Sequence, residues 1–204
     1  MKPNLGLTYD EILYVASTPD ILTIYTESDP DDDRFLGISL ACDGFPDGFY
    51  LSNAHGEEDM TQSQKDKLRE IFKSRYALVF HNAGYDLKRL QRKFNYKHEG
   101  KFYDTMLMIH WVNENLNNYS LDAQSKAYGG KPKNRSVKMQ TMIDNWGWGS
   151  VPLFMMREYS ANDAWITNEL FNKVYPQFRD SGFDGDLWAT EQQFIWVVAD
   201  MVER

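Results

Sequence analysis

The alternation of apolar and polar residues predicts short strands in the first half of the chain. ILTIYTE (21–27) is rich in β-branched residues, which indicates a buried strand. RFLGISLACD (34–43) and GFYLSN (48–53) predict two more strands, and we expect these three to form an antiparallel meander. ALVFHN (77–82) is apolar on both faces, as in a parallel strand that is covered on both sides. KFYD (101–104) predicts a fifth strand.

Helices are predicted from apolar spacing and from end signals. TYDEILYVAST (8–18) begins with the capping pair Thr8 and Glu11. TQSQKDKLREIFKSR (61–75) carries apolar residues at helical spacing. Asp104 is a good N-cap for one further helix. The remaining helices are predicted at 83–95, 105–115, 120–130, 135–145, 151–180 and 184–204. This order of elements predicts an α/β fold around a mixed sheet, in a single domain of residues 1–204.

The charge pattern limits how the chain can bind nucleic acid. The net charge is −8, whereas proteins that bind by broad phosphate neutralisation are basic. Binding would therefore depend on metal ions and on two local basic segments. Residues 88–101 hold six basic residues, as an ordinary helix surface can. Residues 126–138 hold five and no acid, and glycine and proline predict a loop there. Its residues Lys131, Lys133 and Arg135 are candidates for binding a nucleic-acid strand.

Other classes of protein find little support. The apolar run 194–199 is far shorter than the ~20 residues that span a bilayer, so we expect no membrane partner. Cys42 is the single cysteine, which excludes an internal disulfide and fits the cytoplasm. The histidines show no zinc spacing, and His81 is interpreted as structural. No glycine-rich phosphate loop, nucleophile elbow or dinucleotide fingerprint occurs.

Three separated acids and one tyrosine lie at the ends of predicted elements. Glu27 ends the first strand, and Asp86 lies in the first turn of the helix after the fourth. Tyr159 and Asp163 share one face of a late helix. Taken singly, Asp86 suits a helix N-terminus, Tyr159 a core and Asp163 a surface. Together they suit two-metal phosphodiester hydrolysis, which needs converging carboxylates around ions about 3.5–4 Å apart.

The segments around these residues resemble a known family. HNAGYDLKRL (81–90) resembles the second motif of the DEDD 3′–5′ exonucleases, H-N-x-x-x-D-x-x-x-L. YSANDAWIT (159–167) resembles the third motif of the subgroup that carries a tyrosine, Y-x-x-x-D. ILTIYTES (21–28) and the following strand resemble the proofreading domain of family A DNA polymerases, as do residues 103–130. The resemblance covers about residues 8–204 and implies a ribonuclease H-like, mixed five-stranded sheet.

The resemblance also implies roles for individual residues. Glu27, Asp86 and Asp163 would be catalytic ligands of two Mg²⁺ or Mn²⁺ ions. Tyr159 would position the attacking water, and Asn82 would hold the end of the strand beside the substrate.

The first motif departs from the family. The family has D-x-E, whereas this chain has Tyr25 in place of the aspartate. A tyrosine is neutral near pH 7, with a pKa of ~10, and is a poor magnesium ligand. A shift of register would offer Asp29 as a replacement, although the acidic segment 28–33 is typical of a solvated turn. We therefore expect weak metal binding and a reduced rate.

Several functions fit this pattern. The leading one is a proofreading-type 3′–5′ exonuclease that hydrolyses DNA from the 3′ end of a single strand. The alternative is an inactive exonuclease-fold module that binds single-stranded DNA or a replication protein. An RNA-trimming enzyme of ribonuclease D type is a third interpretation.

Two further features bear on partners. Residues 184–204 resemble the helix that leads into a polymerase domain, so the chain is either part of a polymerase or a free-standing relative, such as a phage protein in its host's cytoplasm. Trp146 and Trp148 suit either base stacking or a packed corner.

Overall fold

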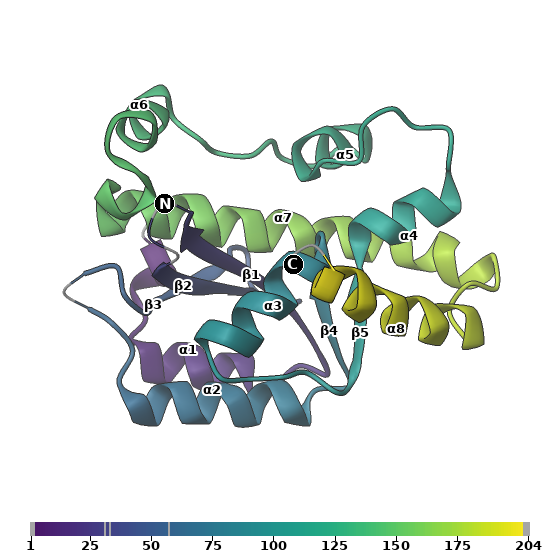
Figure 1. The fold of residues 1–204 in the computed structure, drawn as a ribbon, viewed down its shortest axis with the longest axis horizontal. Helices are drawn as coiled ribbons and strands as arrows, with labels where there is room; N and C mark the ends of the chain where they lie inside the picture. The colour runs from purple at the N-terminus through teal and green to yellow at the C-terminus, as the bar shows by residue number, and fades with distance from the viewer. Residues whose placement is uncertain (1–2, 31, 33, 57, 202–204) are drawn as a thin grey trace.

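A five-stranded mixed sheet runs through the centre of the molecule (Figure 1). The computed structural model describes residues 3–30, 32, 34–56 and 58–201. The strand order is β3-β2-β1-β4-β5. Pairs β1–β2 and β2–β3 are antiparallel and β1–β4 is parallel, as the sequence predicted, and β4–β5 is also parallel. The strands are β1 (Ile21–Asp29), β2 (Arg34–Ala41), β3 (Phe49–Ser52), β4 (Ala77–Phe80) and β5 (Lys101–Asp104).

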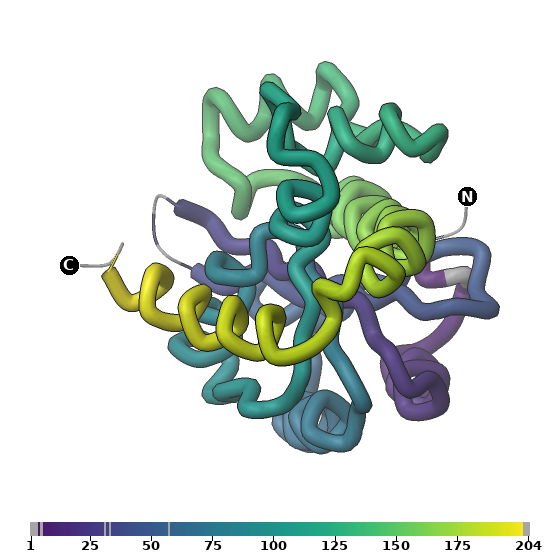
Figure 2. The backbone as a smooth tube through the Cα atoms, turned by 90° about the vertical axis from the view of Figure 1, so that its right-hand side faces the viewer, coloured from purple at the N-terminus to yellow at the C-terminus, as the bar shows by residue number. Residues whose placement is uncertain are grey.

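Helices cover both faces of this sheet. On one face, Leu22 and Ile24 of β1 join a core with Leu13 of α1 and Leu68 of α2. On the other face, α7 packs against the first three strands, and α5 packs on α7 (Figure 2). The helices are α1 (Tyr9–Ala16), α2 (Gln62–Ser74), α3 (Ala83–Lys93), α4 (Thr105–Val112), α5 (Leu121–Ala127), α6 (Val137–Trp146), α7 (Leu153–Asp180) and α8 (Asp186–Met201).

The predicted elements are confirmed in type and order, and their ends differ by a few residues. Strand β1 extends two residues beyond the predicted end, through a register shift between Glu27 and Ser28. Two short 3₁₀ helices, Pro3–Gly6 and Trp148–Ser150, were not predicted. Within the described residues, no helix combines the length and apolar character needed to cross a bilayer.

Polar contacts fix α7 on the sheet. The Thr23 hydroxyl donates to Asn168 Oδ1 at 3.0 Å, and the Ser39 hydroxyl donates to the Ser160 hydroxyl at 2.7 Å. A Cβ atom at Gly48 would lie 2.1 Å from the carbonyl oxygen of Ala161, so this helix approaches the start of β3 too closely for a side chain. These contacts set the position of the helix turn that carries Tyr159 and Asp163.

Asp104 fixes the helix that carries Asp86. Its carboxylate accepts the Met106 amide at 2.9 Å, which confirms it as the N-cap of α4. The same carboxylate accepts the amides of Asn82 and Ala83, at 2.9 and 2.7 Å, at the start of α3. Asn82 adopts a left-handed conformation, with φ of 69°, which asparagine tolerates well. One buried acid therefore serves two helix N-termini.

Candidate active site

The structure brings the predicted acids and tyrosine into one cluster. Strand β1 supplies Glu27, the first turn of α3 supplies Asp86, and α7 supplies Tyr159 and Asp163. All four are buried, and Asp163 has no exposed surface. The charges of Asp163 and Asp86 both raise the pKa of Glu27, which places the three carboxyl groups within electrostatic range. Thr26 and Ser160, which sequence reasoning missed, contribute hydroxyl groups to the same cluster and adjoin motif residues in the chain.

Glu27 is a carboxyl group with too few partners. It is 6% exposed, and its Oε1 atom has no hydrogen-bond partner among the residues that the structure describes. Burial and the charge of Asp163 raise the pKa of Glu27 to about 8, against the opposing effects of Lys133 and Ser160. Near neutral pH this carboxyl group therefore keeps its proton for much of the time, unless a further positive charge is present.

Asp86 is bound to the backbone of β1. One of its oxygen atoms, Oδ1, accepts both the amide and the hydroxyl of Thr26, each at 2.7 Å. Burial nevertheless raises the pKa of Asp86 to about 7, because these two hydrogen bonds only partly offset desolvation. These hydrogen bonds join the first turn of α3 to β1, the strand that carries Glu27.

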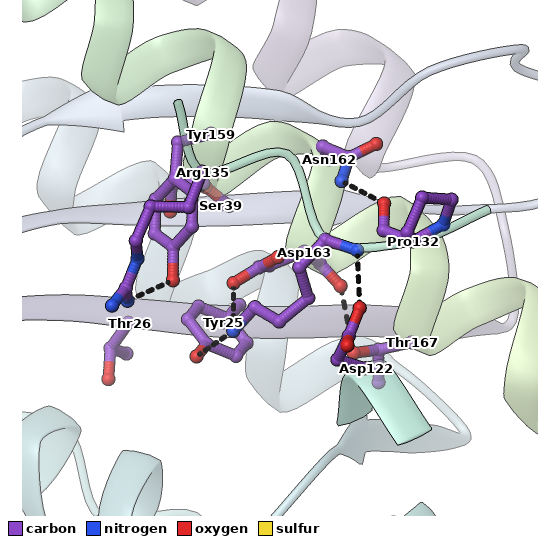
Figure 3. A network of polar contacts seen from close by, with 12 residues as sticks. Tyr25, Thr26, Ser39, Asp122, Pro132, Arg135, Tyr159, Asn162, Asp163 and Thr167 are labelled. Atoms are coloured by element: carbon purple, nitrogen blue, oxygen red, sulfur yellow. Dashed lines mark hydrogen bonds and ion pairs between the residues drawn. The ribbon is translucent and has the colours of Figure 1, made fainter. Parts of the chain in front are cut away.

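A lysine ammonium group lies next to Asp163 and Tyr25, which are labelled side by side in Figure 3. Lys133 Nζ is 2.6 Å from Asp163 Oδ2 and 3.5 Å from the Tyr25 hydroxyl. Burial alone would lower the pKa of Lys133, but Asp163 and Tyr159 raise it, so the group is charged. Burial raises the pKa of Tyr25 well above its ordinary value, so Tyr25 is neutral. The sequence analysis identified Lys133 as a candidate for binding a nucleic-acid strand, but it did not place this residue among the acids.

Tyr159 is held by a cation and an indole ring. Arg135 donates to the Tyr159 hydroxyl at 2.8 Å, and its guanidinium carbon lies 4.9 Å from the centre of the Trp148 ring. The rings of Trp148 and Tyr159 are 5.8 Å apart. Burial raises the pKa of Tyr159 to about 12, so the hydroxyl keeps its proton. Trp148 therefore belongs to a packed corner, whereas Trp146 is 68% exposed.

The two basic segments, the first at residues 88–101 and the second at residues 126–138, have different environments. In the second, Lys131 is exposed and its ammonium lies 4.1 Å from the centre of the Trp165 ring. In the first, Lys88 pairs with Asp200, and Lys101 pairs with Asp184 at 2.8 Å. The first segment therefore contributes to the attachment of the C-terminal region.

Other predicted residues lie at the edge of the cluster or outside it. The Asn82 side chain is exposed at the start of α3. His81 is structural as predicted, since its Nδ1 pairs with the Thr105 hydroxyl at 2.8 Å and burial lowers its pKa to about 4.

The prediction of a solvated turn at residues 28–33 is wrong for Asp29. It is buried rather than solvated, and its Oδ2 accepts the Gly149 amide at 2.7 Å. This carboxylate therefore contacts the 3₁₀ helix Trp148–Ser150, and Asp29 is the last residue of β1 rather than part of a turn. The other aspartates of this turn, Asp31 and Asp33, lie outside the described residues.

The comparisons with known proteins agree with this geometry. A sequence profile described as 3′-5′ exonuclease matches residues 19–179, which is most of the chain. The chain belongs to the 3′–5′ exonuclease family. DNA polymerase I of Borreliella burgdorferi is 24% identical over 201 residues. That match covers 96% of this chain and 22% of the polymerase, so the chain spans about a fifth of its relative.

Two solved structures share the fold. Escherichia coli RNase D, an exoribonuclease, superimposes with a TM-score of 0.71 at 14% identity, over 94% of this chain and 48% of that one. Brucella melitensis NrnC with bound Mg²⁺ gives a TM-score of 0.67 at 15% identity, over 91% and 86% of the two chains. At these identities the likeness supports the predicted ribonuclease H-like fold.

The carboxyl oxygen atoms of the acid cluster suit a divalent cation. Of the three buried carboxyl groups, Asp163 pairs with the Lys133 ammonium, and Glu27 Oε1 and Asp163 Oδ1 lack hydrogen bonds within the described ranges. Oxygen ligands of this kind are those that Mg²⁺ prefers. As the side chains now lie, no three acidic, histidine or cysteine groups of the described residues surround one point. An ion would therefore bind with a turn of the Glu27 or Asp163 side chain.

Proposed function

We propose that this chain is a 3′–5′ exonuclease that shortens single-stranded DNA from its 3′ end. The observation that carries the proposal is the convergence of Glu27, Asp86, Asp163 and Tyr159 from three separate elements. DNA is favoured as the substrate because the match to DNA polymerase I extends over 96% of the chain.

Glu27, Asp86 and Asp163 would hold Mg²⁺ or Mn²⁺. A bound divalent ion lowers the pKa of water and stabilises charge on the departing oxygen. The water oxygen forms a bond to phosphorus while the bond between phosphorus and the 3′ oxygen breaks. The departing oxygen gains a proton, and the products are a mononucleotide 5′-phosphate and a strand shortened by one residue.

Tyr159 is suited to orient the attacking water. Its hydroxyl accepts from Arg135 at 2.8 Å and keeps its own proton, since burial raises its pKa to about 12. It can therefore donate this proton in a hydrogen bond and point a lone pair of the water at the phosphate. Tyr25 supplies no carboxylate, so the rate is expected to be low.

The test is degradation of a 5′-labelled single-stranded DNA with Mg²⁺ and with Mn²⁺. We expect slow loss of single nucleotides from the 3′ end. Asp86→Asn should abolish it, and Tyr159→Phe should reduce it by roughly 100-fold, at the lower end of the ~10²–10⁴-fold range for a positioned acid–base group. Asp66→Asn, on an exposed part of α2, is the matched control and should keep full activity. Turnover that survives Asp86→Asn would refute the site, and faster cleavage of an RNA of the same sequence would refute the choice of DNA.

One observation favours a second candidate function. The ion pair between Lys133 and Asp163 occupies a carboxylate that a metal would need. A module that binds a strand end, beside a polymerase domain or other replication proteins, would need no metal. Retained single-strand affinity without any binding of Mn²⁺ would support this module and contradict the enzyme.

A further inference from the structure

The charge of the cluster differs from that of the family motif by two units. The motif has four acids around two divalent ions, so the charges of acids and ions cancel. Here Tyr25 removes one negative charge, and Lys133 adds one positive charge beside Asp163. When all three carboxyl groups are ionised, as a bound cation favours, three carboxylates and one ammonium leave a charge of −2, which one divalent ion balances.

The position of the ammonium fits this exchange. Lys133 Nζ lies 2.6 Å from Asp163 Oδ2 and 3.5 Å from the hydroxyl of Tyr25, the residue at the altered position of the motif. It also lies 5.4 Å from the ring centres of both Tyr25 and Tyr159. The positive charge therefore lies between the altered position on β1 and the motif on α7.

The loop that carries Lys133 is fixed on both sides of that residue. The Lys133 amide donates to Asp122 Oδ1 at 3.1 Å, and Asn162 donates to the Pro132 carbonyl at 3.4 Å (Figure 3). Two residues further on, Arg135 binds the Tyr159 hydroxyl. The side chain of Lys133 is 23% exposed. These contacts make the ammonium a built part of the cluster rather than a mobile surface charge.

We propose that the Lys133 ammonium replaces one of the two divalent ions, so that the site binds a single Mg²⁺ or Mn²⁺. Lys133 then presents the second positive charge to the phosphate that is cleaved. The inference rests on the proposed function and assigns Lys133 a role in the reaction in addition to binding the strand. It also accounts for a tyrosine at position 25. A site with one metal ion does not require the aspartate that two metal ions would share.

The first measurement is the number of Mn²⁺ ions bound, by calorimetry and by the electron paramagnetic resonance of free Mn²⁺. We expect one ion for the natural chain. Lys133→Met keeps the length of the side chain without its charge. It should bind one ion about tenfold more tightly, because a like charge near the ion is gone, and should lose most nuclease activity. The double variant Tyr25→Asp with Lys133→Met restores four acids and should bind two ions.

Lys131→Met is the matched control for metal binding. It removes the same charge from the same loop, but its ammonium faces Trp165, so the number and affinity of Mn²⁺ ions should not change. Thermal melting of Lys133→Met should show a lower Tm than the natural chain in a chelator and a larger rise with Mn²⁺.

The possible failures are distinguishable. Two ions in the natural chain, or nuclease activity that rises in Lys133→Met, would overturn the role of Lys133 and leave the exonuclease proposal in place. Absence of both Mn²⁺ binding and DNA degradation in every variant would overturn the proposed function as well.

Discussion

The buried carboxyl group of Glu27 lowers the stability of the folded chain as pH rises. Its pKa of about 8 in the folded chain exceeds the ordinary value of 4.5, because burial and Asp163 disfavour the charged form. Between these two values the folded state binds more protons than the unfolded state, so the free energy of unfolding falls as pH rises. The cost at pH 8 is on the order of 4 kcal/mol, and it is absent below pH 4.5.

Glu27→Gln should therefore stabilise the protein in a chelator at pH 8. An uncharged amide avoids this cost, so we expect a rise in Tm of several degrees at pH 8 and little change at pH 5. Thermal melts of the two chains at both pH values test this. His81, which must stay neutral when buried, loses stability in acid equally in both chains and cancels in the comparison. An equal or lower Tm for the variant at pH 8 would show that Glu27 is already compensated.

Asp104 carries the clearest prediction at the scale of elements. Its carboxylate accepts three backbone amides, from Asn82, Ala83 and Met106, and so caps α3 and α4 together. Asp104→Ala leaves these donors unsatisfied, and each helix cap is worth ~1 kcal/mol. We expect a loss of roughly 2–4 kcal/mol in the free energy of unfolding, measured by urea denaturation. Asp122→Ala, at the partly exposed first turn of α5, removes the acceptor of one backbone amide and should cost less, and an equal loss in both would contradict the double cap.

The helices and strands were predictable because their signals are local. The capping pair Thr8 and Glu11 forms as expected, and β-branched and apolar runs became the five strands. The acids of the site were found through their spacing from element ends. The contact between Lys133 and Asp163 was not found, because it joins residues 30 apart through a loop with no periodic signal. The burial of Asp29 was not predicted, because its carboxylate contacts Gly149, which lies 120 residues further along the chain.

The molecule as a whole is acidic, and the loop within its basic segment 126–138 carries Lys133 into contact with Asp163. Strand binding should therefore depend on few phosphate contacts. Binding to single strands weakens with salt by a log–log slope of about −0.7 per phosphate neutralised. With Lys131, Lys133 and Arg135 as the contacts, we expect a slope of about −2 for a labelled oligothymidine, by fluorescence anisotropy between about 50 and 200 mM NaCl in a chelator.

The contribution of the loop can be separated from that of the remaining surface. Lys131→Gln removes one exposed charge from it and should make the slope shallower by about 0.7. Lys67→Gln removes an exposed charge from α2, which joins the core on the sheet face away from α7, and should leave the slope unchanged. A slope of about −4 or steeper in the natural chain would mean that the strand contacts a wider basic surface than this loop. An equal effect of both variants would mean that net charge, rather than the position of the loop beside Asp163, governs binding.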